Sequence, residues 1–222
     1  MKKVLMINGS PKRSKSSTGE YIHLIQKLLP SDWVYETIEI GRYKKGDLLP
    51  AFNEYSIMVF AFPLYVDAAP GILTAWMEAV EKKARVSNPD LNVWGLLQCG
   101  FYEGTQNGPA LDIIGNFCRR MGFIWQGGAG IGTGAMIQAV KDAPLEAGIR
   151  KSVTSLLKNM VHEMVGVMAD SMSLEKEAPA IGFTQYSFPW FLYRMGGQMG
   201  WNKEARKNGL KRRELYARPY LV

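Results

Sequence analysis

The residues best suited to chemistry lie in the turn after the first apolar segment, at positions 8–18. Its hydroxyl and basic side chains include Ser10, Lys12, Ser16, Ser17 and Thr18. If a helix begins near Thr18, its unpaired backbone N–H groups and the positive end of its dipole point at this turn, and both favour an anion. The turn therefore predicts a phosphate site, although an ordinary polar turn before an N-capped helix would have a similar composition.

Two nucleotide motifs that use such a turn are absent from it. The triphosphate motif GxxxxGK[ST] needs a second glycine followed by lysine, and the dinucleotide motif GxGxxG needs glycines where Pro11 and Ser14 stand. The turn therefore disfavours a triphosphate or a dinucleotide as its ligand.

Two further segments with side chains suited to ligand binding follow expected strands. Pro63, Leu64, Tyr65 and Val66 come directly after a long apolar run, and the segment 99–105 follows a later one. In open α/β sheets, ligands lie outside the carboxyl ends of the strands. We therefore expect these segments to lie near the first turn.

The elements that must position these residues follow an alternating pattern, which is typical of an α/β fold with a parallel sheet. Five strands are expected, at Lys3–Asn8, Trp33–Ile40, Tyr55–Phe62, Asn92–Gln98 and Gly122–Gly128. The main helical patterns are Thr18–Leu29, Pro70–Val86, Gln106–Met121 and Pro144–Met168. The glycine-rich stretch from Gly127 to Gly134 is expected to form a flexible loop after the fifth strand.

Two pairs of segments carry a family resemblance, Gly9-Ser10-Pro11 with Ser16-Ser17-Thr18 and Pro63-Leu64-Tyr65 with Pro70-Gly71. Together they resemble the flavodoxin-like NAD(P)H-dependent FMN reductases and quinone reductases, over roughly residues 2–133. The resemblance implies five parallel strands in the order 2-1-3-4-5, helices on both faces and an extra C-terminal tail. It also implies a homodimer.

The resemblance assigns a role to each loop. In this family the first loop holds the FMN phosphate, the second lies along the isoalloxazine ring through its backbone, and the third contacts the pyrimidine edge. The residues implied to bind FMN are Ser10, Lys12, Ser16, Ser17, Thr18, Pro63, Leu64, Tyr65, Val66, Cys99, Gly100, Phe101, Tyr102 and Gly104. Hydride transfer from NADH or NADPH through the flavin needs no obligatory protein acid or base, so no catalytic side chain is assigned.

The cysteines and histidines predict no metal centre. A neighbouring branch of the family, the iron–sulfur flavoproteins, carries a cysteine cluster between its second and third strands, but residues 41–54 of this chain contain no cysteine. An ordinary cluster needs four thiolates, and the chain has only Cys99 and Cys118, far apart in sequence. His23 and His162 have no partner at ligand spacing.

The charge of the chain is unevenly distributed. It has 27 basic against 20 acidic residues, a net charge of +7, but residues 186–222 alone hold eight basic and two acidic residues. A nearly neutral body argues against a nucleic-acid partner, and the aromatic residues of the tail are awkward in a free arm. We therefore expect a flavodoxin-like FMN-binding domain at 1–170 and an extension at 171–222 that packs on the body or on a partner subunit.

The cysteine content and the short apolar runs predict a cytoplasmic protein without membrane insertion. The leading hypothesis is an FMN-dependent oxidoreductase that transfers hydride from NAD(P)H to a quinone, free flavin, nitro compound or related small acceptor. The alternative is a flavodoxin-type electron carrier without its own pyridine-nucleotide oxidase activity. The basic charge and the long segment after the fifth strand favour the enzyme.

Overall fold

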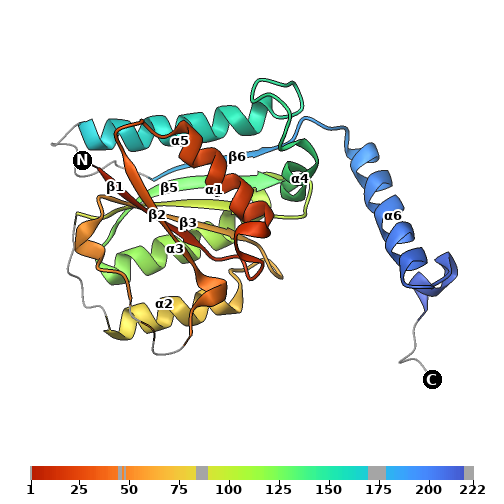
Figure 1. Cartoon of the computed structure of the whole chain (residues 1–222), viewed down its shortest axis with the longest axis horizontal. Coiled ribbons are helices and arrows are strands. Elements are labelled where there is room, and N and C mark those ends of the chain that lie inside the picture. Colours follow the sequence, from red (N-terminus) through yellow and green to blue (C-terminus); the bar gives the residue numbers. More distant parts are fainter. Residues whose placement is uncertain (1, 45–46, 48, 84–89, 170–178, 218–222) are drawn as a thin grey trace. The chain divides into compact units, whose positions relative to one another are not determined.

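The computed structural model describes residues 2–44, 47, 49–83, 90–169 and 179–217. The chain forms two compact units, Met1–Tyr186 and Ser187–Val222. The first unit is a parallel sheet with helices on both of its faces, as Figure 1 shows. The α/β class predicted from the sequence is therefore confirmed.

The sheet contains six described strands, in the order β2-β1-β3-β4-β5-β6, and every neighbouring pair is parallel. The strands are β1 (Lys3–Asn8), β2 (Val34–Glu39), β3 (Ile57–Pro63), β4 (Asn92–Gln98), β5 (Ile124–Gly132) and β6 (Ala180–Gln185). The expected order 2-1-3-4-5 is confirmed. The expected number of five strands is wrong, because β6 extends the sheet beyond β5.

The additional strand comes from the segment that the sequence analysis placed in the C-terminal extension. Residues of β6 pair with β5 from Gly127 opposite Ala180 to Gly132 opposite Gln185. As an edge strand of six residues, β6 leaves Ile181 and Phe183 partly exposed, so it lacks the continuous apolar run that marks a fully covered strand.

The glycine-rich stretch belongs mostly to β5 rather than to a flexible loop, which corrects the expectation. Glycine is needed there because neighbouring backbones approach closely. A Cβ at Gly132 would lie 2.2 Å from the carbonyl oxygen of Tyr102, in the segment that precedes the short helix η4 (Gly104–Asn107). The glycines of β5 therefore let the chain's own loop rest on the sheet.

Two hydrophobic clusters hold the helices to the sheet. On one face α2 (Gly71–Lys83) and α3 (Gly108–Met121) cover side chains such as Phe60 and Leu97. On the other face α1 (Ser17–Leu28), α4 (Ile137–Val140) and α5 (Lys151–Ala169) cover side chains such as Val59 and Leu96. The central strands are buried on both sides, as their continuous apolar runs predict.

The last helix of the first unit begins later than expected. The sequence pattern predicts a start at Pro144, whereas α5 begins at Lys151. The buried Arg150 donates from Nη1 to the carbonyl oxygens of Val140 and Lys141 at 3.1 Å, and also to that of Ala143. These bonds satisfy carbonyl groups at the end of α4, so the chain turns before α5 starts.

The second unit contains the helix α6 (Trp190–Lys207) and the short helix η6 (Arg212–Tyr216). The expected docking of the extension on the body or on a partner stays a prediction. In the described part of the chain, no helix is long and apolar enough to cross a membrane. The final turn of the helix expected at Pro70–Val86 lies outside the described residues.

Candidate functional site

The three loops singled out by the sequence follow neighbouring strands. β3 lies between β1 and β4, and the backbone bonds continue past the strand ends. The amide of Gly9 donates to Ala61 O at 2.8 Å, and the amide of Leu64 donates to Gln98 O at 2.9 Å. The structure therefore brings the loops after β1, β3 and β4 to the same edge of the sheet.

The first loop ends in a capped helix. Ser16 is the N-cap of α1, because its Oγ accepts a bond from the Gly19 amide at 3.1 Å and donates to the Arg13 carbonyl oxygen. Ser17 and Thr18 are the first two helical residues, and their amides have no acceptor within the helix. The hydroxyl of Ser16 is thus used by the protein itself, whereas the backbone of the first turn can serve an anion.

The other predicted residues of this loop differ in accessibility. Ser10 and Thr18 are buried, Ser17 is partly exposed and Lys12 is exposed. The Ser10 Oγ accepts a bond from the Lys12 amide at 3.3 Å, which stabilises the turn. Lys12 is the basic residue among the predicted FMN-binding residues of this loop, and its exposed side chain can reach an anion at the surface.

Residues after β2 hold the loop in place. The Glu39 Oε1 accepts a bond from the Ser14 amide at 2.8 Å, and its Oε2 pairs with Arg42 Nε at 2.7 Å. Arg13, whose φ is +60°, donates from Nη2 to Gly41 O at 3.0 Å. Glu39 was not among the residues predicted from the sequence, although its position at the end of a predicted strand could have identified it.

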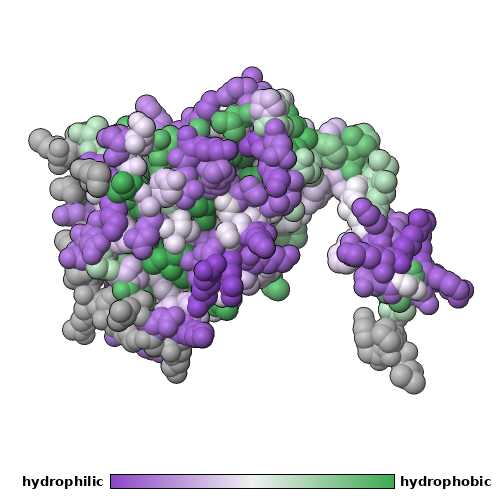
Figure 2. Space-filling model, viewed as in Figure 1, coloured by the Kyte–Doolittle hydropathy of each residue, from purple (hydrophilic) through white to green (hydrophobic). Residues whose placement is uncertain are grey.

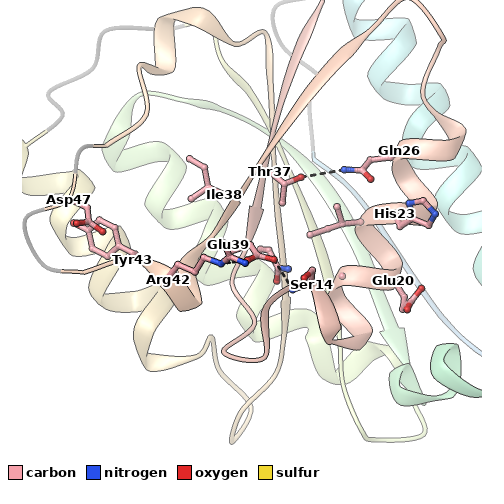
Figure 3. A pocket seen from close by; sticks show the side chains of 13 residues that line it. Ser14, Glu20, His23, Gln26, Thr37, Ile38, Glu39, Arg42, Tyr43 and Asp47 are labelled. Atoms are coloured by element: carbon pink, nitrogen blue, oxygen red, sulfur yellow. Dashed lines mark hydrogen bonds and ion pairs between the residues drawn. The ribbon is translucent and has the colours of Figure 1, made fainter.

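A cavity of about 840 Å³ lies on the β2 side of this loop, between α1 and β2 (Figure 3). It borders the loop at Ser14 and Gly19 and is lined further along α1 by Glu20, His23 and Gln26. The residues expected to bind FMN are not among those that line it. The cavity therefore adjoins the first loop through Asn8 and Ser14 without including its predicted FMN-binding residues.

The loop after β3 forms a tight two-residue turn. Tyr65 and Ala68 exchange backbone bonds of 2.9 and 3.3 Å around Val66 and Asp67. Both central residues have positive φ, +50° and +59°, which is the backbone of a type I′ turn. The amides of Leu64 and Tyr65 are used inside the protein, so those of Val66 and Asp67 are the ones that the turn leaves for a ligand.

Apolar surface is exposed beside this turn. The side chain of Val66 is 97% exposed, and those of Tyr65 and Phe101, from the loop after β4, are close to half exposed. Pro63 and Leu64 are partly buried at the end of β3. The edge where the loops meet therefore offers aromatic surface next to unpaired backbone amides.

The loop after β4 is anchored by its buried cysteine. The Cys99 Sγ accepts a bond from Asn107 Nδ2 at 3.4 Å, and the same amide group donates to Gly104 O at 2.8 Å. Burial raises the pKa of the Cys99 thiol, so the thiol is neutral and poorly nucleophilic. Cys99 thus shapes the loop, while Gly100 is exposed and a Cβ placed there would meet no neighbour.

Buried polar residues that the sequence analysis missed connect the loops to each other. Gln98, at the end of β4, donates from Nε2 to Thr18 Oγ1 at 3.4 Å and so links the third loop to α1. The Tyr21 hydroxyl donates to Gly134 O at 3.0 Å and lies 3.2 Å from the Tyr186 hydroxyl. Their signal in the sequence was weak, because single polar residues in apolar surroundings are common.

The arrangement can bind a ligand that combines an anion with a flat polar ring. The start of α1 supplies amides for the anion, the turn after β3 supplies two more, and the loops after β3 and β4 supply aromatic surface beside them. Among the described residues, no cluster of three or more His, Cys, Asp or Glu side chains could hold a metal ion.

Comparisons with known proteins identify the fold. No protein-family model matches the chain, and no curated protein matches it. An NADH:FMN oxidoreductase in its apo form is 18% identical, with a TM-score of 0.54, over 81% of this chain and 97% of that one. A flavodoxin from Streptococcus pneumoniae TIGR4 is 11% identical, with a TM-score of 0.53, over 74% and 98% of the two chains.

A third solved structure is an FMN-dependent NADH-azoreductase from Bacillus anthracis str. Ames Ancestor, in complex with FMN. It is 15% identical to this chain, with a TM-score of 0.50, over 77% of this chain and 100% of that one. At these identities the likeness concerns the fold. The first unit therefore has the flavodoxin-like fold, enlarged by β6.

Proposed function

We propose that this chain is an FMN-dependent oxidoreductase that transfers hydride from NADH or NADPH to a small acceptor such as a quinone, a free flavin or a nitro compound. The observation that carries the proposal is the start of α1, where the amides of Ser17 and Thr18 lack helical acceptors next to the loops after β3 and β4. The NADH:FMN oxidoreductase and the FMN-bound azoreductase of the same fold support it.

The residues present fit FMN. The first turn of α1 and Lys12 would hold the phosphate, and the amides of Val66 and Asp67 with the exposed Gly100 would face the polar edge of the ring. Bound FMN would supply the hydride chemistry itself. The chain's own residues would bind and orient, and the neutral Cys99 thiol holds the third loop in shape rather than reacting.

A flavodoxin-type electron carrier is the second candidate, supported by the likeness to the S. pneumoniae flavodoxin. Two features favour the enzyme. The flavodoxin is matched over 98% of its length by 74% of this chain, so this chain is longer, and it carries a net charge of +7. We also propose a cytoplasmic homodimer, in keeping with the family resemblance.

The main experiment is anaerobic titration of the purified protein. We expect it to be yellow or to take up added FMN, and its flavin absorbance to bleach rapidly on addition of NADH or NADPH. Protein that fails to bind FMN would overturn the proposal. Slow bleaching together with a stable one-electron reduced form would favour the carrier.

Aspartate substitutions at the start of α1 test the phosphate site. Ser16→Asp keeps a good N-cap and Ser17→Asp places an acid where the helix dipole favours it, so both variants should fold. Two carboxylates beside a phosphate dianion should weaken FMN binding by at least roughly 100-fold, which corresponds to about 2.7 kcal/mol. Gln26→Glu, which adds one negative charge further along α1, is the control and should bind FMN normally. Unchanged affinity in the double variant would contradict the assignment.

A further inference from the structure

The second compact unit exposes an apolar surface along α6. Phe191, Met195 and Met199 are four residues apart and therefore lie on one side of the helix, and their side chains are 62%, 53% and 63% exposed. We name these three residues the apolar ridge. Trp190 and Trp201 are also more than half exposed, on another side of the helix. Exposed large apolar side chains at this density mark a surface that binds something.

Basic side chains accompany the ridge. Residues 186–222 hold eight basic and two acidic residues, a balance of +6. Arg194, Lys203 and Arg206 are exposed, and no carboxylate in the described part of the chain pairs with them. Lys207 lies 3.9 Å from Glu204, which is an exposed and weak pair. The charge of the extension is therefore available to a negatively charged partner.

The two properties are combined within a single helix. Figure 2 shows hydrophobic residues over the first turns of the extension and mostly hydrophilic residues toward its end. The guanidinium of Arg194 lies 5.6 Å from the centre of the Trp190 ring, so charge and aromatic surface occur at the same level of the helix. Tryptophan and basic residues of this kind are typical of segments at the boundary between lipid headgroups and acyl chains.

We propose that α6 and the basic segment after it bind the surface of an anionic lipid bilayer. The apolar ridge would enter the headgroup boundary, and the basic residues would contact the lipid phosphates. Charge favours this partner over a second copy of the extension, because two surfaces of +6 repel each other. The methionines of the ridge favour it over nucleic acid, because methionine offers no aromatic ring on which bases stack.

This binding surface goes beyond the proposed oxidoreductase and does not depend on it. It uses residues of the second unit only, whereas the candidate FMN site lies entirely in the first unit. The expected consequence is a protein held at a membrane surface, where apolar acceptors dissolve.

The test is co-sedimentation of the full-length protein with lipid vesicles. We expect binding to vesicles of phosphatidylcholine and phosphatidylglycerol in equal parts, weaker binding as salt is raised, and little binding to phosphatidylcholine alone. Because each basic residue near an anionic surface contributes about 1 kcal/mol, Lys203→Glu with Arg206→Glu should weaken binding by roughly thirty-fold or more. Phe191→Ser with Met199→Ser should weaken it as well.

The matched control reverses two exposed charges on the first unit, Lys27→Glu with Arg119→Glu, and so changes the net charge by the same amount. This control should keep vesicle binding within a few-fold of the natural protein. Equal losses in both charge variants, or no vesicle binding at low salt, would overturn the proposal. It would also be overturned if a single-stranded oligonucleotide displaced the protein from vesicles, or if the ridge variant lost self-association rather than vesicle binding. FMN content, measured in parallel, reports separately on the proposed function.

Discussion

At the scale of single residues, the turn after β3 combines two features that are unfavourable for stability. Val66 is β-branched and has a φ of +50°, a conformation that side chains with a branched Cβ rarely adopt. Its side chain is 97% exposed, so no core contact compensates for the strain. Strained residues of this kind concentrate at binding sites, where the backbone must present a particular group to a ligand.

Replacing Val66 with asparagine should relieve this strain while keeping the turn. Asparagine tolerates positive φ, so Val66→Asn should stabilise the protein by about 1 kcal/mol, which corresponds to roughly 2–4 °C in melting temperature. Asp67→Asn serves as the control and should leave the melting temperature nearly unchanged, because aspartate already tolerates this conformation. A lower melting temperature for Val66→Asn, measured by calorimetry without added FMN, would contradict this account of the turn.

At the scale of elements, the loop after β1 depends on the end of β2. One carboxylate oxygen of Glu39 accepts a hydrogen bond from the Ser14 amide, the other forms an ion pair with Arg42, and the Arg13 side chain donates to the carbonyl oxygen of Gly41. The loop is thus held from the side by a neighbouring strand. Glu39 has no predicted contact with FMN and acts as a positioning residue.

Removing the Glu39 side chain should loosen this loop. A hydrogen bond to a charged group contributes roughly 1.5–3 kcal/mol, so Glu39→Ala should weaken FMN binding by about ten-fold or more, measured by quenching of flavin fluorescence. Glu39→Gln retains an oxygen that can accept from the Ser14 amide and should restore most of the affinity. If alanine and glutamine weaken binding equally, the bond to Ser14 does not position the loop.

At the scale of the whole molecule, the boundary between the two units lies after Tyr186. Tyr186 is buried, its amide donates to Thr133 Oγ1 at 3.1 Å, and its hydroxyl lies 3.2 Å from that of Tyr21. Burial raises the pKa of both phenols, so both stay protonated at neutral pH. The end of the first unit is therefore part of its core.

Two truncated chains that differ by only three residues should differ strongly in stability. Ending the chain after Ser187 should leave the melting temperature and the FMN content unchanged and abolish vesicle binding. Ending it after Thr184 removes Gln185 and Tyr186, and losing a buried aromatic residue should destabilise the first unit by roughly 3–5 kcal/mol. If the chain ending after Ser187 were destabilised as much as the chain ending after Thr184, the extension would have to pack on the body, which is one of the two positions expected from the sequence.

The order of the first five strands was implied by the family resemblance. The sequence by itself determined the α/β class and the three loops that meet at one edge of the sheet. These features depend on local patterns: continuous apolar runs such as Tyr55–Phe62 mark buried strands, and the hydroxyl-rich segment 16–18 marks the start of α1. Adjacent parallel strands then place their following loops together.

Only the tertiary structure decided which of those groups remain available to a ligand. The amides of Leu64 and Tyr65 and the hydroxyl of Ser16 looked equivalent to their neighbours in sequence, yet each is used by a bond inside the protein. The structure also decided that β6 joins the sheet, because its pairing with the glycines of β5 depends on residues about 50 positions apart. Long-range pairing leaves no periodic signal in either segment, so a linear pattern could not predict it.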